Sequence, residues 1–148
     1  MAKIEESVMI DRPVEDVWKF VTDLSKLPKW ITEVLELRQT STGPLGVGAT
    51  CEFREKMRNT TMTISSRVTE YELNRRLSFE HISGPAKGSI ITFSMDTIGG
   101  KTKFTNTNDM KFSGFYKLFG SFFTPTLRRA VVTSLGNLKH ILESEEQS

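Results

Sequence analysis

The sequence predicts an α+β fold in which a curved antiparallel β-sheet wraps around a long C-terminal α-helix, with two short helices after the first strand. Over residues 49–110, apolar and polar side chains alternate with period two, which is typical of strands that expose one face to solvent. Residues 127–142 instead place apolar side chains at helical spacing. We expect residues 1–148 to form a single domain, because this length can bury a self-sufficient core.

The first strand and the two short helices are predicted by residues near the N-terminus. Alternate residues from Ile4 to Ile10 share one face of a strand, and Pro13 after it has the fixed φ that suits a first helical position. Apolar residues then fall on one side of a helix over residues 14–21. Residues 25–30 predict a second, shorter helix that is interrupted by a proline.

The rest of the sheet is predicted by strand and turn patterns. A strand over residues 34–38 and a glycine-rich loop over residues 43–48 lead into a meander with turns at residues 59–60, 73–76, 84–88 and 98–101. The expected register places Cys51 beside Val68, Val68 beside His81, His81 beside Ile91, and Ile91 beside Asn108. This register keeps the apolar faces matched, so the sheet has one continuous inner face.

The C-terminal helix is predicted by an apolar stripe. The stripe comprises Leu127, Val131, Leu135, Leu138 and Leu142. Thr124 and Pro125 resemble an N-cap and a first helical residue, which leaves residues 115–123 as either a separate turn or a kinked extension of the helix.

Composition argues against several classes of function. Twenty basic and eighteen acidic side chains are spread along the chain, so no basic stripe favours nucleic acid. The single Cys51 cannot form an internal disulfide, and no spaced metal signature is present, so we expect no metal and no cofactor. The sequence lacks the apolar stretches of a signal peptide or a membrane span, which favours a cytoplasmic protein. We interpret Cys51, Trp18 and Trp30 as core residues.

Several segments resemble motifs of a known family. They are residues 10–23 (IDRPVEDVWKFVTD), Leu27-Pro28-Lys29-Trp30, Gly46-Val47-Gly48, Val68-Thr69-Glu70-Tyr71 and Leu138-Lys139. On these segments the chain resembles the polyketide cyclase/dehydrase and lipid transport branch of the START and plant pollen-allergen superfamily (SRPBCC). The resemblance implies the helix-grip fold and a cavity for an apolar or amphiphilic small molecule, and it carries no pattern of catalytic residues.

The expected inner face of the sheet is unusually polar for a plain core. Its polar members are Glu55, Ser66, Glu70, His81, Asn106 and Asn108. Unpaired polar groups are costly to bury, so this pattern indicates water or a ligand inside the fold. The alternative for Glu55 and Glu70 is that they lie at the ends of the sheet and simply reach solvent.

We therefore expect a ligand cavity between the sheet and the C-terminal helix. Its apolar wall would comprise Phe53, Ile64, Val68, Phe79, Ile91, Phe93, Met110, Phe119, Phe123, Leu127 and Val131, and its polar groups would be Glu55, Ser66, His81, Asn106 and Asn108. His81 and Glu55 are the candidates for acid-base chemistry, with the asparagines holding a carbonyl oxygen. The alternative for His81 is a ring hydrogen-bonded within the wall.

Three hypotheses for function follow. The first is binding or transport of a lipid, isoprenoid, quinone or polyketide in the cavity, and the second is a cyclase or dehydrase that uses the same cavity. The third is a protein-interaction module, like the co-chaperones of this fold. It would use the aromatic residues 115–123, which could also gate the cavity, touch a membrane surface transiently or pack into the core. We expect a monomer or a weak dimer.

Overall fold

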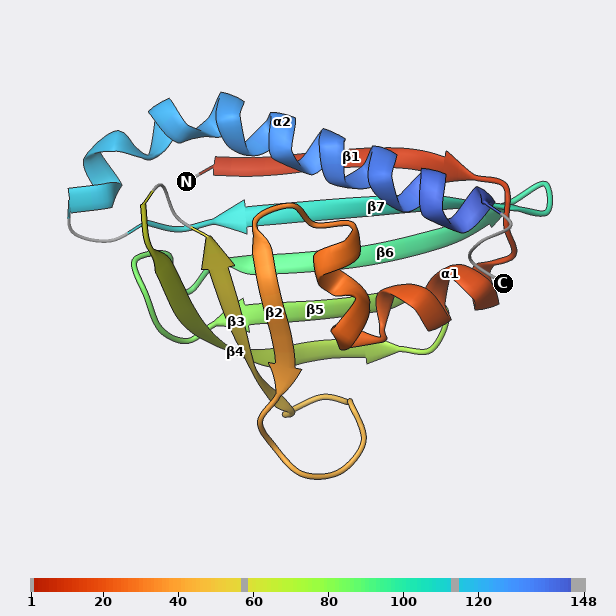
Figure 1. Ribbon diagram of the computed structural model, residues 1–148, viewed down its shortest axis with the longest axis horizontal. Helices are drawn as coiled ribbons and strands as arrows, with labels where there is room; N and C mark the ends of the chain where they lie inside the picture. The colour runs from red at the N-terminus through yellow and green to blue at the C-terminus, as the bar shows by residue number, and fades with distance from the viewer. Residues whose placement is uncertain (1, 57–58, 113–114, 145–148) are drawn as a thin grey trace.

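The computed structural model describes residues 2–56, 59–112 and 115–144, with the backbone alone for Ala2 and residues 115–123. The sheet has seven antiparallel strands in the order β1-β7-β6-β5-β4-β3-β2, and one long helix lies along its β1 side (Figure 1). The strands are β1 (Ala2–Ile10), β2 (Val34–Gln39), β3 (Thr50–Lys56), β4 (Thr61–Glu72), β5 (Arg76–His81), β6 (Ile90–Ile98) and β7 (Lys101–Met110). The helices are α1 (Val14–Val21), the 3₁₀-helix η1 (Leu24–Lys29) and α2 (Phe115–Glu143). The predicted α+β helix-grip architecture is confirmed.

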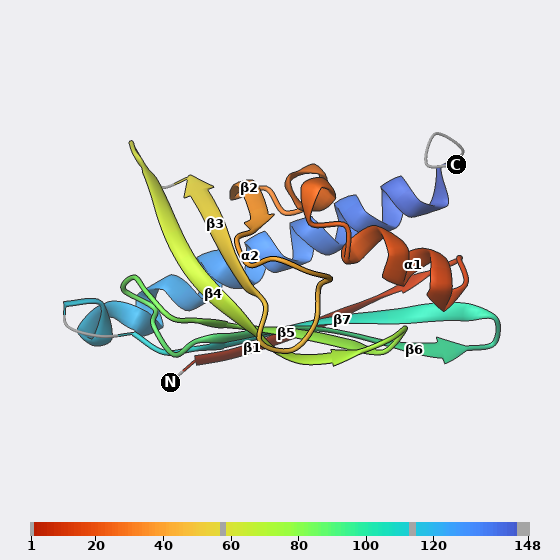
Figure 2. The same cartoon turned by 90° about the horizontal axis from the view of Figure 1, so that it is seen from below.

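The sheet is strongly curved around α2. In Figure 2, β5, β6 and β7 form an almost flat floor, whereas β4 and β3 rise from it on one side and bring β2 over toward the helix. Helix α2 packs against the edge strand β1, and α1 and η1 cover the sheet near the C-terminal end of α2.

The short helices form where the sequence predicts them. Pro13 accepts the first backbone hydrogen bonds of α1, and the Arg12 side chain pairs with Asp16 one turn later at 2.9 Å. Asp23 caps η1 by accepting from the backbone N–H of Ser25. Pro28 inside the segment lacks an N–H, and the segment adopts a single 3₁₀-helix rather than an α-helix.

Aromatic side chains from several elements meet in the core. Trp30 is fully buried, with its ring centroid 5.3 Å from that of Phe93 and 5.8 Å from that of Phe104. Trp18 is also buried and contacts Tyr71 edge-on. The interpretation of both tryptophans as core residues is therefore confirmed. Trp18 packs α1 against the sheet, and Trp30 does the same at the end of η1.

Three of the predicted strand pairings are wrong by two residues. Cys51 lies opposite Ser66 rather than Val68. His81 also lies opposite Ser66 in β4, and its backbone N–H donates to Ser89 instead of pairing beside Ile91. A shift of two residues keeps every side chain on its predicted face, because side chains alternate with period two. The inner face was therefore predicted correctly for most of the sheet.

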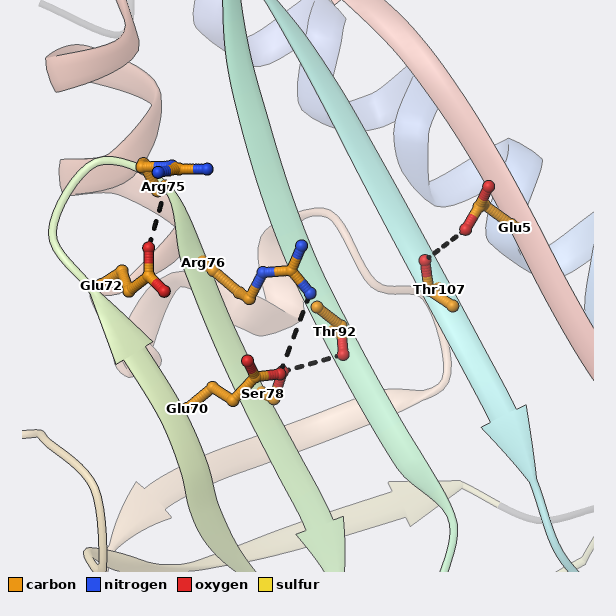
Figure 3. A network of polar contacts seen from close by, with 8 residues as sticks. All are labelled: Glu5, Glu70, Glu72, Arg75, Arg76, Ser78, Thr92 and Thr107. Atoms are coloured by element: carbon orange, nitrogen blue, oxygen red, sulfur yellow. Dashed lines mark hydrogen bonds and ion pairs between the residues drawn. The ribbon is translucent and has the colours of Figure 1, made fainter.

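Glu70 is the exception, because a β-bulge changes its face. The register of β4 against β5 slips by one residue between Val68 and Glu70, which pairs Glu70 with Ser78 instead of Phe79. Figure 3 shows that Glu70 accepts a hydrogen bond from the Ser78 hydroxyl and lies near Arg76, on the face turned away from α2. The expectation that Glu70 belongs to the inner face is wrong.

The β6–β7 hairpin matches the prediction. Ile98 pairs with Lys101, and the two glycines between them have φ values of +58° and +81°. A two-residue turn of this kind requires positive φ at both positions, which glycine adopts without a steric penalty. The turn sets the register of the two strands, so Ile91 lies opposite Asn108 and Phe93 opposite Asn106, as expected.

Helix α2 runs continuously through Pro125, so residues 115–123 are a helical extension rather than a separate turn. The predicted apolar stripe faces the sheet, and Leu135, Leu138 and Leu142 are buried in the core. Polar contacts hold the helix along β1. Arg128 pairs with Glu6, the Lys139 ammonium donates to the Met9 carbonyl at 2.6 Å, and the Asp11 N–H donates to Glu143 at 2.8 Å.

Candidate functional site

A cavity of about 310 Å³ lies between the curved sheet and α2. Its lining residues are Ile31, Glu33, Val34, Phe53, Glu55, Ile91, Phe93, Asn106, Asn108, Met110, Phe112, Thr126, Leu127, Ala130, Val131 and Ser134. Most of these side chains are apolar. Cavities of this kind are the usual sites for small ligands in proteins, with volumes of about 300–1,000 Å³.

Each wall of the cavity comes from a different part of the chain. Strands β3, β6 and β7 supply inward-facing residues at alternate positions, such as Ile91 and Phe93. The opposite wall is α2, where Leu127, Val131 and Ser134 recur at helical spacing. The segment after η1 covers a third side, and the buried Val34 begins β2 there.

Two asparagines form a polar patch in the wall contributed by β7. Asn106 and Asn108 lie on the same face, and the Nδ2 of Asn108 donates to the Oδ1 of Asn106 at 2.7 Å. Both are buried, at 4% and 7% exposure. A primary amide can both donate and accept, so this pair can orient a hydroxyl or a carbonyl group of a ligand.

Two carboxyl groups line the cavity as well. Glu55 is partly buried on β3, and Glu33 lies on the exposed segment before β2. Burial raises the pKa of Glu55, and the neighbouring negative charge of Glu33 raises the pKa further. A carboxyl group with a raised pKa can serve as a proton donor nearer to neutral pH than an ordinary glutamic acid.

His81 lies apart from this cavity. Its ring is 3% exposed and contacts Phe53 edge-on, with the centroids 5.7 Å apart, while Phe53 itself lines the cavity. Burial lowers the pKa of His81 to about 4, so the ring is neutral at physiological pH. Neither His81 Nδ1 nor the Oγ of the opposing Ser66 has a hydrogen-bond partner among the described residues. Of the two acid-base candidates, the structure brings only Glu55 to the cavity.

The predicted ligand-binding residues divide into three groups. The cavity is lined by Phe53, Glu55, Ile91, Phe93, Asn106, Asn108, Met110, Leu127 and Val131. Ile64, Ser66, Val68, Phe79 and His81 are buried but do not line it. The side chains of Phe119 and Phe123 lie outside the described residues, so their roles stay predictions, as do membrane or protein contacts through residues 115–123.

Several lining residues were not predicted from the sequence. Ala130 and Ser134 flank the apolar stripe of α2, and a wider stripe would have included them. Ile31 and Glu33 had no local signal, because their position depends on how the edge strand β2 pairs with β3. Phe112 lies just before the aromatic residues 115–123 that the sequence singled out, and its direction could not be read from the pattern.

The remaining features do not suggest further chemistry in the described part of the chain. Cys51 is a buried core residue, as predicted, and burial raises its thiol pKa to about 11. No three His, Cys, Asp or Glu side chains among the described residues are placed to hold a metal ion. None of the described helices combines the length and apolarity needed to cross a membrane.

Comparisons with solved structures show the same fold in other proteins. A protein of Thermus thermophilus, TTHA0849, is 17% identical with a TM-score of 0.78, over 94% of this chain and 95% of that one. The Zhui aromatase/cyclase of Streptomyces sp. R1128 is 13% identical with a TM-score of 0.79, over 96% and 93%. Ara h 8.0201 is 11% identical with a TM-score of 0.70, over 95% and 97%.

Sequence comparison places the chain in a family. No curated protein matches it at a significant level. The family model described as polyketide cyclase/dehydrase and lipid transport matches residues 1–143, which is nearly the whole chain. The match agrees with the helix-grip fold and with the motifs quoted above. The chain therefore belongs to the polyketide cyclase/dehydrase and lipid transport family.

Proposed function

We propose that this protein binds an apolar or amphiphilic small molecule in the cavity between the sheet and α2. The observation that carries the proposal is the cavity itself, a space of about 310 Å³ lined mostly by apolar side chains. A ligand placed there would gain about 25 cal/mol for each Å² of apolar surface removed from water, before the cost of ordering it. Family membership supports this proposal, because the family description includes lipid transport.

Filling the cavity from α2 tests this proposal. Ala130 lines the cavity, whereas Val132, two residues along the same helix, is 50% exposed. We expect Ala130→Trp to abolish the fluorescence gain of the neutral dye Nile red and Val132→Trp to leave it unchanged. Ser134→Phe is a second filling variant in case Ala130→Trp does not fold, with circular dichroism reporting folding. Equal dye binding by folded filling variants and by the control would contradict the proposal.

A second candidate function is acid-base catalysis of polyketide cyclisation or dehydration in the same cavity. It is favoured by the raised pKa of Glu55 and by the presence of Asn106 and Asn108 in the same lining. In this mechanism Glu55 would exchange a proton with the substrate while the asparagine amides hold the developing oxygen charge. The name of the Zhui aromatase/cyclase supports this candidate.

Catalysis and simple binding give different results for one variant. If Glu55 is the acid-base group, Glu55→Gln should reduce turnover of an added linear polyketone by about 10²–10⁴-fold while leaving Nile red binding intact. Turnover that is unchanged in Glu55→Gln, or absent in the unsubstituted protein for every polyketone tried, would leave binding as the function.

A further inference from the structure

The polar groups that line the cavity restrict the kind of ligand that can bind there. Of the sixteen lining residues in the described part of the chain, two are glutamates and none is lysine, arginine or histidine. The amides of Asn106 and Asn108 add neutral hydrogen-bonding groups. The described lining therefore contains negative and neutral polar groups, and no cation that could pair with an acidic ligand.

The cations that neighbour the lining residues in sequence are directed elsewhere. Arg54 and Lys56 flank Glu55 on β3, are exposed, and project to the opposite face because side chains alternate along a strand. Arg128, next to Leu127 on α2, pairs with Glu6 of β1. Lys111, between the lining residues Met110 and Phe112, is exposed and its side chain lies beside Gly88, and Arg129, next to Ala130, is exposed as well. None of these five cations is among the residues that line the cavity.

We propose that the cavity selects amphiphiles whose polar end is an uncharged or positively charged hydrogen-bond donor, a hydroxyl or an ammonium group, and discriminates against carboxylates. This inference rests on the proposed binding function and specifies its ligand class. A ligand carboxylate would bring a further negative charge beside Glu55 and Glu33 in a partly buried space, where like charges repel strongly. An ammonium or hydroxyl group could instead donate to a carboxylate oxygen.

The behaviour of Glu55 is consistent with this selection. The pKa of Glu55 is raised by burial and then by the charge of Glu33, so the site already tolerates negative charge poorly. An ammonium group would relieve this repulsion, and a hydroxyl group would add none. Tail length and shape would be recognised separately by the apolar wall.

Three probes with the same tail test the selection. Displacement of Nile red by decanol, decylamine and decanoate compares three polar ends on the same ten-carbon chain. The measurement is made at pH 7.5, below the solubility limit of decanol and below the micelle concentrations of the two charged probes. We expect decanol and decylamine to bind at least about tenfold more tightly than decanoate. Glu55→Gln should reduce the ratio of the dissociation constants of decanoate and decylamine by about tenfold. Glu33→Gln should reduce this ratio less, because Glu33 is exposed. Glu52→Gln, on the opposite face of β3 where Glu52 pairs with Arg38, is the matched control.

The outcomes separate this inference from the proposed function. Equal binding of the three probes, tighter binding of decanoate, or a ratio that Glu55→Gln does not change would overturn the selection while leaving ligand binding intact. If Nile red and all three probes fail to bind, the binding function is itself wrong and the selection falls with it. Tight binding of decanol alone, with decylamine bound as weakly as decanoate, would also overturn the proposal. That result would show that the cavity excludes charged groups of either sign.

Discussion

The buried ring of His81 links the stability of this fold to pH. Because burial lowers its pKa from 6.5 to about 4, the unfolded chain binds a proton at pH values where the folded chain does not. The contribution of His81 to stability therefore falls as pH decreases from about 6.5 to about 4, and its full effect corresponds to about 3 kcal/mol. The ring is held against Phe53, so this cost is part of the same packing that forms the cavity wall.

Replacing His81 should remove this pH dependence. We expect the free energy of unfolding of the unsubstituted protein, measured with urea, to decrease by about 2–3 kcal/mol more between pH 7 and pH 4.5 than that of His81→Phe. His81→Gln serves as a second variant if the phenylalanine does not pack. His140→Gln is the control, since His140 is exposed on α2. Parallel pH profiles for the protein and both His81 variants would show that the ring is not buried as described.

Cys51 provides a chemical probe of the same core. Its thiol is 1% exposed with a pKa of about 11, and the thiolate is the reactive form. A disulfide reagent such as DTNB should therefore not modify Cys51 at pH 8 in native protein and should modify one thiol per chain in denaturant. Complete reaction within minutes without denaturant would contradict the burial of β3.

At the scale of elements, the sequence predicts the face on which a strand side chain lies better than it predicts the register between neighbouring strands. The glycine pair at residues 99–100 determined the β6–β7 register correctly, because few turns other than a two-residue hairpin suit it. The turn before β5 instead has three residues with Asn74 at φ +61°, and a bulge around Thr69 precedes it in β4. Neither feature has a strong local pattern, which explains the shifted β4–β5 pairing and the wrong face for Glu70.

The same reasoning explains how much of the site was predictable. Residues such as Phe53, Asn106 and Val131 were placed at the cavity because periodicity alone determines their face. His81 was misplaced because its position along the strand, which decides whether it reaches the cavity, depends on register. Glu33 could not be found, since its position depends on pairing between β2 and β3.

Two glycines should respond to alanine with opposite signs. Gly100 in the β6–β7 turn has a φ of +81°, so Gly100→Ala should lower the free energy of unfolding by about 1 kcal/mol. Gly136 lies inside α2 with open space around the position of a Cβ, so Gly136→Ala should raise it by about 0.5–1 kcal/mol. Urea unfolding of the two variants checks both values. A neutral Gly100→Ala would mean that the turn is of another type.

At the scale of the whole molecule, the cavity results from the way α2 is attached to the sheet. Polar contacts of Arg128, Lys139 and Glu143 attach the helix along β1. Its buried leucines, Leu135, Leu138 and Leu142, pack against the sheet near α1. Among the residues of α2 that line the cavity, Ala130 and Ser134 have small side chains. The curved sheet and α2 therefore pack closely at the buried leucines and leave the space of about 310 Å³ beside Ala130 and Ser134.

The most direct test of ligand binding in this space is native mass spectrometry of the protein purified from its own cells, with extraction of the molecules released on denaturation. We predict one apolar or amphiphilic molecule per chain in the unsubstituted protein and none in Ala130→Trp. A measured mass equal to that of the polypeptide alone, unchanged after incubation with Nile red and decanol, would contradict the central claim.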